Sequence, residues 1–240
     1  MSIILSVSAV CDVGCKKPNN EDMILLHDEM FRDGKRQVNF DANDRLIIAV
    51  ADGVGGLEKG EVASERVLTA LRDILSRIPA DLSAEELREV FDTYAAETHN
   101  SLPNDMGSTL AGLFFYQEKL FRYHAGDSRI YRFRRGELER LTVDHSLRES
   151  GGQKDAPSNI ITNALGGGSS AFIEFAEVDF PFRNNDIYLL SSDGMHDLVP
   201  QGEILAALNK PKAAEKLTDL AKKRGGKDNI SVITINIKEI

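Results

Sequence analysis

Cysteine is scarce in this sequence of 240 residues, which contains only Cys11 and Cys15. Three residues separate the two cysteines, and the chain has no further cysteine to complete a zinc knuckle. The pair is therefore typical of free thiols in a reducing cytoplasm, where we expect the protein to be located.

Positive charge is in deficit, because 29 lysines and arginines face 38 aspartates and glutamates, for a formal net charge of -9. A general affinity for nucleic acid or an anionic membrane needs the opposite balance. The apolar start, Met1–Val10, lacks the basic region of a secretory signal. The longest other apolar run, Leu46–Ala51, is far too short for a membrane span. We therefore expect no nucleic-acid partner and no membrane span.

Features that would divide the chain are also absent. The sequence shows no Pro/Ser-rich linker, charge block, internal repeat or low-complexity segment. The candidate site residues described below extend from residue 17 to residue 229. We therefore expect a single domain over residues 1–240.

Several familiar catalytic signatures are missing. The sequence contains neither GxxxxGK[ST], which would form a P-loop, nor GxSxG, which would form a nucleophile elbow. Its histidines show no pair at metal-binding spacing, so we expect each to be a surface or core residue. These histidines are His27, His99, His124, His145 and His196.

Apolar runs bounded by turn residues predict many antiparallel strands, interrupted by helix pairs. The expected strands cover residues 3–10, 46–51, 111–116, 120–125, 130–133, 172–180, 186–192 and 230–237. The expected helices extend from Ala63 to Ile78, from a capping box at Ser83 and Glu86 to Tyr94, and over residues 201–208 and 211–223. Because strands and helices do not alternate strictly, the order predicts a layered α+β fold.

Four aspartates are the main chemical signal in the sequence. Asp52, Asp127, Asp193 and Asp228 each lie where a strand-like run ends or a glycine-containing turn breaks the chain. Carboxylates gathered from distant segments repel each other strongly unless a hard divalent cation offsets their charge. The pattern therefore predicts a metal site.

Asp52 and Asp193 carry most of this prediction. Asp52 follows the apolar run LIIAVA and precedes three glycines, and a helix is expected from about Gly60. An Asp-Gly hairpin fits this context poorly, so we expect a strand-to-helix loop that approaches a ligand. Asp193 shows the same pattern: the Asp193-Gly194 pair directly follows the strand-like run IYLLSS, and no returning strand is expected after it.

Asp127 and Asp228 are more ambiguous. Asp127 lies between two expected strands, where an ordinary turn explains it as well as a ligand role does. Asp228 taken alone is a loop carboxylate before the last strand. If the four residues share a site, their oxygen ligands favour Mg²⁺ or Mn²⁺ over zinc.

Eight short segments, taken together and in order, resemble the motifs of the type 2C metal-dependent protein phosphatases of bacterial type. They are Gly14–Asp22 (GCKKPNNED), Ala51–Gly56 (ADGVGG), Gly107–Leu110 (GSTL), Ala125–Arg129 (AGDSR), Thr142–Leu147 (TVDHSL), Ile161–Gly166 (ITNALG), Ser191–Gly194 (SSDG) and Asp228–Ile230 (DNI). The resemblance covers almost the whole chain.

The resemblance implies a four-layer α-β-β-α sandwich, with two antiparallel sheets flanked by helix pairs and a dinuclear Mn²⁺ or Mg²⁺ centre at one end. Asp52 would bridge both metals, and the Gly53 carbonyl would bind one of them. Asp193 and Asp228 would bind the other. Asp127, together with Asp193, would bind a weaker third metal.

Further residues have implied roles around these ligands. Glu21, Asp22 and Asn229 would surround the metal ligands, and the two acids would orient metal-bound waters. Lys17 occupies the position of the family's usual phosphate-binding arginine and offers a point charge in place of a bidentate fork. Val54 stands where many eukaryotic members have a histidine, as in bacterial-type members.

The implied activity is hydrolysis of phosphoserine or phosphothreonine in proteins by a water activated between two metals, without a phosphoenzyme. Asp52, Asp193 and Asp228 would be essential for catalysis, and the enzyme would oppose a serine/threonine kinase in a signalling circuit. A flap of about residues 145–160, including Arg148–Ser158 (RESGGQKDAPS), would help to select the phosphoprotein.

Two alternatives stay open from the sequence. An inactive module could keep the fold and bind a phosphoprotein, and Lys17 is the feature that points this way. The chain could also be a phosphatase that acts on a small phosphorylated metabolite, because no motif in the sequence identifies the substrate.

Overall fold

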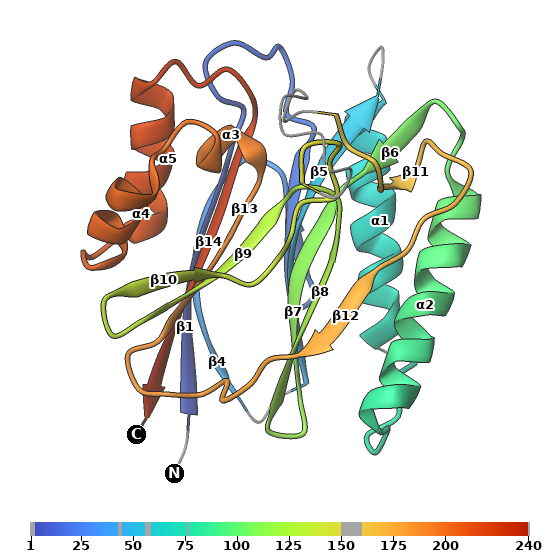
Figure 1. Cartoon of the computed structure of the whole chain (residues 1–240), viewed down its shortest axis with the longest axis horizontal. Coiled ribbons are helices and arrows are strands. Elements are labelled where there is room, and N and C mark those ends of the chain that lie inside the picture. Colours follow the sequence, from blue (N-terminus) through green and yellow to red (C-terminus); the bar gives the residue numbers. More distant parts are fainter. Residues whose placement is uncertain (1–2, 43–44, 56–58, 76, 150–159, 240) are drawn as a thin grey trace.

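Two antiparallel sheets pack face to face, and helices cover the outer face of each (Figure 1). The structure is a computed structural model that describes residues 3–42, 45–55, 59–75, 77–149 and 160–239. The arrangement confirms the predicted α+β class and the α-β-β-α order of layers. Most of the expected flap, Arg148–Ser158, lies outside the described residues.

The first sheet has six strands in the order β10-β9-β13-β14-β1-β4. Its central strands β1 and β14 pair along their whole length, from Ile3 opposite Glu239 to Asp12 opposite Ile230. The strands are β1 (Ile3–Asp12), β4 (Gly34–Asp41), β9 (Arg129–Arg134), β10 (Glu137–Arg140), β13 (Ile187–Ser191) and β14 (Ile230–Glu239).

The second sheet has eight strands, and β5 lies at its centre. One edge of β5 pairs with β2, and the other pairs first with β7 and then with β6. The strands are β2 (Asp22–Leu26), β3 (Glu29–Phe31), β5 (Leu46–Gly55), β6 (Met106–Ser108), β7 (Leu110–Tyr116), β8 (Lys119–Ala125), β11 (Leu165–Gly166) and β12 (Glu174–Glu177).

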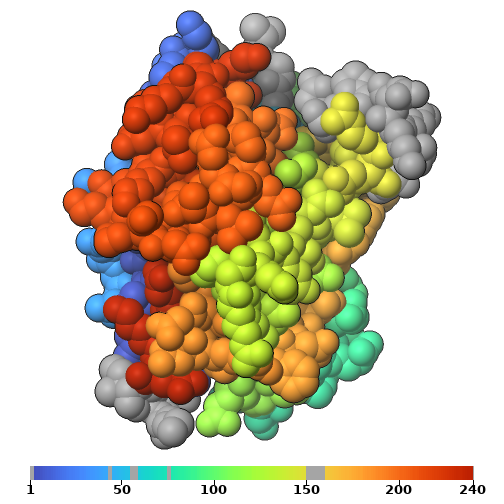
Figure 2. All heavy atoms as spheres, turned by 60° about the vertical axis from the view of Figure 1, so that its left-hand side comes forward, coloured from blue at the N-terminus to red at the C-terminus, as the bar shows by residue number. Residues whose placement is uncertain are grey.

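Among the described residues, five helices complete the layers. The helices α1 (Gly60–Leu75) and α2 (Ala84–Ser101) cover the second sheet. The short α3 (Asp193–His196) with α4 (Gln201–Leu208) and α5 (Ala213–Lys223) lie on the first sheet. Figure 2 shows the α4 and α5 side in red and orange, with the β9–β10 hairpin in yellow-green beside it. None of the described helices combines the length and apolarity needed to cross a bilayer.

Side chains of alternating direction explain the layers. In β5, Ile47 and Ala49 pack toward α1 and α2, whereas Leu46, Ile48 and Val50 pack between the sheets. Both faces of the strand are therefore buried, which is why its sequence is continuously apolar rather than alternating.

The four helices expected from the sequence correspond to α1, α2, α4 and α5, whereas the short α3 was not predicted and α1 ends at Leu75, before the expected Ile78. The Ser83 hydroxyl accepts a hydrogen bond from the Glu86 N–H, and the Glu86 carboxylate accepts one from the Ser83 N–H, so the predicted capping box is present. By contrast, the strands β2, β3 and β4 were not predicted. The strand β3 has three residues and β4 is mostly polar, so neither gives a clear strand pattern. The apolar run of β2, Met23–Leu26, was missed.

Phe91 on α2 anchors the helix layer to the second sheet. Its ring centroid lies 4.9 Å from that of Tyr123 and 4.6 Å from that of Phe175, and the side chain is fully buried. We expect Phe91→Ala to lower the free energy of unfolding by about 3–5 kcal/mol, because it leaves a cavity between helix and sheet. Urea denaturation measures this value. The exposed neighbour Asp92→Ala should change it by less than about 0.5 kcal/mol, and equal losses would contradict the assignment.

Candidate metal centre

The predicted acidic residues meet at one end of the sandwich, the upper end in Figure 1. Here β1, β5 and β13 end, β2 and β14 begin, and α3 follows β13 directly. Asp193 is the first residue of α3, and Asp228 lies two residues before β14. The fold thus brings carboxylates from both sheets to one place.

Asp52 lies inside a strand, which corrects the predicted strand-to-helix loop. The strand β5 continues to Gly55, and Asp52 pairs there with Asp22 of β2. The chain continues in extended form because β5 exchanges its partner β7 for β6 beyond Val50. A purely local prediction could not include that second partner.

Thr109 fixes the backbone around Asp52. Its N–H donates to the Asp52 carbonyl oxygen at 2.9 Å, and its hydroxyl accepts from the Asp52 N–H at 3.1 Å. The same hydroxyl lies 2.8 Å from the hydroxyl of Ser128, which follows Asp127. One side chain therefore couples the positions of two predicted ligands.

Gly53 is required by a close approach of two chain segments. Its N–H donates to the Glu21 carbonyl oxygen at 3.2 Å. A Cβ atom at this position would lie 1.9 Å from the carbonyl oxygen of Gly60, where α1 begins. Only glycine allows β5 to lie this close to the first turn of α1.

Ser192 connects the two sheets at the acidic cluster. Its hydroxyl donates to Asp22 Oδ2 at 2.7 Å and accepts from the Ser231 N–H at 2.9 Å. Asp22 belongs to the second sheet, whereas Ser231 lies in β14 of the first. The sequence offered no signal for this role, because it depends on contact between residues far apart in the chain.

Asn229 holds the Asp228 loop in place. Its side-chain amide donates to the carbonyl oxygens of Val13 and Asn19, both at 3.0 Å, and its Oδ1 accepts from the Glu21 N–H at 2.8 Å. A Cβ atom on Gly194 would lie 1.9 Å from the Asn229 carbonyl oxygen. The segments that carry Asp193 and Asp228 are thus in direct contact.

The electrostatic consequences are strong. Burial, and then the charge of Asp22, raises the pKa of Asp52 well above its ordinary value. Burial and the charge of Asp127 do the same for the pKa of Asp193. Burial raises the pKa of Asp22 to about 6, and burial with the charge of Asp144 raises the pKa of Asp127 to about 6. The carboxylates are close enough to oppose one another's ionisation.

Two buried carboxylate oxygens are suited to binding a cation. Asp22 Oδ1 and Asp193 Oδ1 are buried and have no hydrogen-bond partner among the described residues. A buried polar atom without a partner is costly, and a carboxylate more so. The residues present therefore fit a divalent cation with oxygen ligands.

Lys17 places a positive charge against this cluster. Its Nζ lies 2.8 Å from Asp228 Oδ1 and 3.4 Å from Glu21 Oε2. Burial alone would lower the pKa of Lys17, but the hydrogen bond and charge of Asp228 raise it. Lys17 therefore lies beside the acidic cluster and contacts its carboxylates, and its phosphate-binding role stays a prediction.

A second group of potential ligands meets below the Asp127 turn. The ring centroids of His124 and His145 are 4.2 Å apart, and the Glu174 carboxylate lies 3.6 Å from His124 Nδ1. Burial, followed by the charge of His145, lowers the pKa of His124 to about 4. Both histidines are buried, which fits the predicted core role, but the sequence did not predict their contact.

The hydrogen bonds of His145 argue against a metal in this second group. Its Nδ1 accepts from the Gly126 N–H at 3.2 Å and contacts the Asn163 amide nitrogen at 2.8 Å. The ring proton must then be on Nε2, which leaves that atom no lone pair for a cation. The backbone N–H of His145 also donates to the Gly126 carbonyl oxygen at 2.9 Å. His145 thus stabilises the turn that carries Asp127.

The raised pKa of Asp22 predicts how stability depends on pH without metal. An acid whose pKa is higher in the folded state binds more protons there, so stability falls as the pH rises from about 4 through about 6. In chelator at pH 7.5, Asp22→Asn should raise the free energy of unfolding by up to about 3 kcal/mol, at about 1.4 kcal/mol per pKa unit.

Urea denaturation at pH 4 and pH 7.5 tests this prediction. The gain should shrink at pH 4, where Asp22 is protonated in the folded protein. The exposed Asp219→Asn on α5 serves as the control and should show no such gain. A destabilised Asp22→Asn at pH 7.5 would contradict the predicted repulsion.

Comparisons with solved structures agree with the architecture. The serine/threonine phosphatase of Streptococcus agalactiae has a similar structure, with a TM-score of 0.81, 26% identity, and coverage of 98% of this chain and 100% of that one. The catalytic domain of the serine/threonine protein phosphatase PstP, solved with two manganese ions, gives a TM-score of 0.75 and 29% identity, covering 99% of this chain and 100% of that one.

Sequence comparison leads to the same group of proteins. The serine/threonine phosphatase Stp of Listeria monocytogenes is 30% identical over 216 residues, which cover 80% of this chain and 85% of that protein. A family model described as protein phosphatase 2C matches residues 26–222, most of the chain. This chain therefore belongs to the protein phosphatase 2C family.

Proposed function

We propose that this chain hydrolyses phosphoserine and phosphothreonine in protein substrates by metal-dependent catalysis. The observation that carries the proposal is the meeting of Asp52, Asp193 and Asp228, from both sheets, beside buried carboxylate oxygens that lack partners. Membership of the protein phosphatase 2C family supplies the reaction class. The PstP structure with two manganese ions supports a dinuclear centre by analogy.

The proposed ligand set contains only oxygen. The carboxylates of Asp52, Asp193 and Asp228 and the carbonyl of Gly53 would hold two Mn²⁺ or Mg²⁺ ions. Asp127 would join Asp193 at a weaker third position. The proximity of the two side chains supports this, because burial and then the charge of Asp127 raise the pKa of Asp193.

The metals, when bound, would supply a hydroxide nucleophile near neutral pH and offset the charge of the phosphoryl group. Direct attack by water fits the side chains nearby. The Ser192 hydroxyl is already engaged with Asp22 and Ser231. Cys11 is buried, and burial followed by the charge of Asp22 raises the pKa of its thiol. Neither is a good nucleophile, so a covalent phosphoenzyme is not required.

Neighbouring residues would position this chemistry. Asp22 and Asn229 keep the ligand segments of the two sheets together through Ser192 and the Glu21 N–H. The Lys17 ammonium forms ion pairs with both Glu21 and Asp228. A cation bound by Asp228 would compete with this ion pair, which leaves the Lys17 ammonium available for a substrate phosphate.

The biological setting is also part of the proposal. Opposition to a serine/threonine kinase follows from the proposed reaction, since a kinase must supply the phosphorylated side chain. Cys11 and Cys15 are both free thiols, which favours the reducing cytoplasm.

Hydrolysis of p-nitrophenyl phosphate and of a phosphothreonine peptide, with and without Mn²⁺, tests the function. We expect turnover to require Mn²⁺ and to fall at least about a hundredfold in Asp193→Asn, because a metal ligand is lost. Asp219→Asn, an exposed aspartate on α5, should retain full activity.

Each outcome separates the candidate functions. Folded protein that shows no turnover with Mn²⁺ would support an inactive binding module. Turnover of the aryl phosphate without turnover of any phosphopeptide would favour a small phosphorylated metabolite as the substrate. Metal-independent turnover would contradict the proposed centre.

Lys17 predicts a separable effect on substrate binding. We expect Lys17→Ala to raise the KM for the phosphopeptide more than it lowers kcat, whereas Lys17→Arg should preserve or lower the KM by bidentate contact. Lys16→Ala, its exposed neighbour, is the matched control.

Isothermal titration should also show Mn²⁺ binding to Lys17→Ala that is tighter by up to about fivefold, because the competing ammonium of Lys17 is removed. Weaker Mn²⁺ binding would contradict this role.

A further inference from the structure

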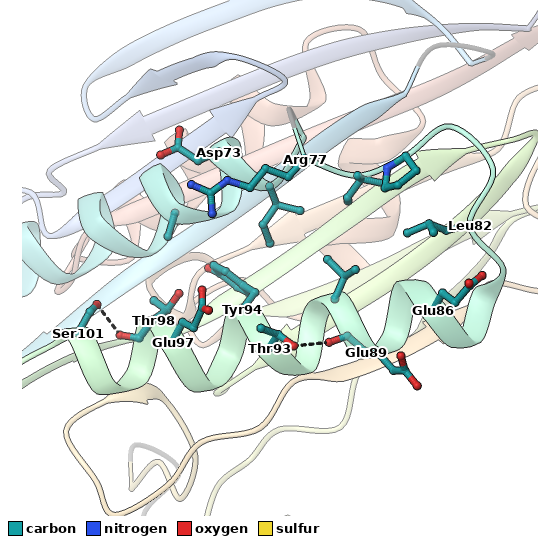
Figure 3. Close-up of a pocket in the computed structure, with 15 residues that line it drawn as sticks. Asp73, Arg77, Leu82, Glu86, Glu89, Thr93, Tyr94, Glu97, Thr98 and Ser101 are labelled. Atoms are coloured by element: carbon teal, nitrogen blue, oxygen red, sulfur yellow. Dashed lines mark hydrogen bonds between the residues drawn. The ribbon is translucent and has the colours of Figure 1, made fainter.

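A groove of about 690 Å³ runs between α1 and α2 on the outer face of the molecule (Figure 3). Its floor is apolar, and most of its floor side chains are only partly buried by the protein itself. The floor residues are Ala70, Ile74, Ile78, Leu82, Val90 and Tyr94. Partly covered apolar side chains in a groove of this size are typical of a binding surface.

The rim of the groove is strongly acidic. Glu86, Glu89 and Glu97 project from α2, and Asp73 lies on the α1 side together with Arg77 (Figure 3). Neither Glu89 nor Glu97 forms an ion pair with any residue that the structure describes. Arg72 also lies 3.9 Å from Asp73, so four acidic groups meet two basic groups, and the acidic surplus on the α2 side gives this surface a negative potential.

Hydrogen bonds fix residues 79–82 at one end of the groove. The Tyr116 hydroxyl accepts from the Leu82 N–H at 2.7 Å and donates to the Pro79 carbonyl oxygen at 2.8 Å. The Gln117 side chain donates to the Ala80 carbonyl oxygen at 2.5 Å. These contacts fix the loop between the helices, so a ligand would not have to order it.

One further hydrogen bond fixes the floor. The Tyr94 hydroxyl donates to the Val67 carbonyl oxygen of α1 at 2.8 Å, which connects the two helices beneath the groove. The groove is therefore formed before any partner binds. Preformed apolar grooves bind without the entropy cost of organising their walls.

We propose that this groove binds a basic amphipathic helix of a partner protein. An apolar helix face would cover Ile74, Leu82 and Val90, and lysine or arginine side chains beside it would meet Glu89 and Glu97. Both walls are helices with satisfied backbones, so an added β-strand has no edge to pair with. The acidic rim repels anionic lipid and nucleic acid.

The groove is separate from the acidic cluster. Gly60 begins α1 beside Gly53, whereas Ile74 lies near the other end of the same helix, about 20 Å away at 1.5 Å per residue. None of the groove residues is a proposed metal or phosphate ligand. Partner binding can therefore be measured independently of catalysis.

The test uses the full chain and a fluorescein-labelled, 18-residue peptide with leucine on one helical face and lysine on the other. Fluorescence anisotropy measures its Kd. We expect Glu89→Lys combined with Glu97→Lys to weaken binding at least about tenfold. The matched control, Glu118→Lys combined with Asp219→Lys, makes the same change in net charge at exposed positions elsewhere and should change the Kd less than about twofold.

A second measurement locates the peptide on the unmodified protein. Amide chemical shifts of the ¹⁵N-labelled chain should change at α1 residues near Ile74 and at α2 residues near Val90 when the peptide is added. A peptide with the same composition in scrambled order should bind at least about tenfold more weakly, since it has no apolar face. Equal losses in both double variants, equal binding of the scrambled peptide, or shift changes elsewhere on the chain would overturn the proposal.

Discussion

Mutual repulsion among buried carboxylates is the constraint that organises this end of the molecule. Asp22 and Asp52 lie opposite each other on β2 and β5, and the charges of Asp127, Asp193 and Asp228 reach them from other segments. Such an arrangement is unfavourable in a folded protein unless protons or cations neutralise it. The surrounding structure keeps the groups together despite this cost, which is typical of a site whose purpose is to bind a cation.

The packing of the two sheets holds these carboxylates together against their mutual repulsion. Ser192 joins Asp22 to β14, and Thr109 fixes the backbone of Asp52 and contacts Ser128. Asn229 joins the loop before β14 to the loop between β1 and β2. Behind them, the apolar core between the sheets fixes the relative position of the strand ends. The proposed ligands are thus placed by rigid elements. The α1–α2 groove lies on the outer, helix-covered side of the second sheet.

Much of this could be predicted from sequence, and the misses have physical causes. Asp-Gly pairs after apolar runs identified Asp52 and Asp193, and the capping box at Ser83 marked the start of α2 correctly. Asp52 was wrongly expected in a loop because the partner that extends β5, strand β6, lies more than 50 residues away. The supporting roles of Ser192 and Thr109, and the contact of His124 with His145, likewise depend on tertiary neighbours that no local pattern records.

If divalent cations replace protons at the acidic cluster, calorimetric titration of Mn²⁺ detects the exchange. Titrations at pH 6 in buffers of different ionisation enthalpy give the number of protons released on binding. Because the pKa of Asp22 is raised to about 6 and that of Asp52 lies well above its ordinary value, binding should release protons, and release should decline in Asp52→Asn. Mn²⁺ binding without proton release, or binding unchanged in Asp52→Asn, would contradict the account.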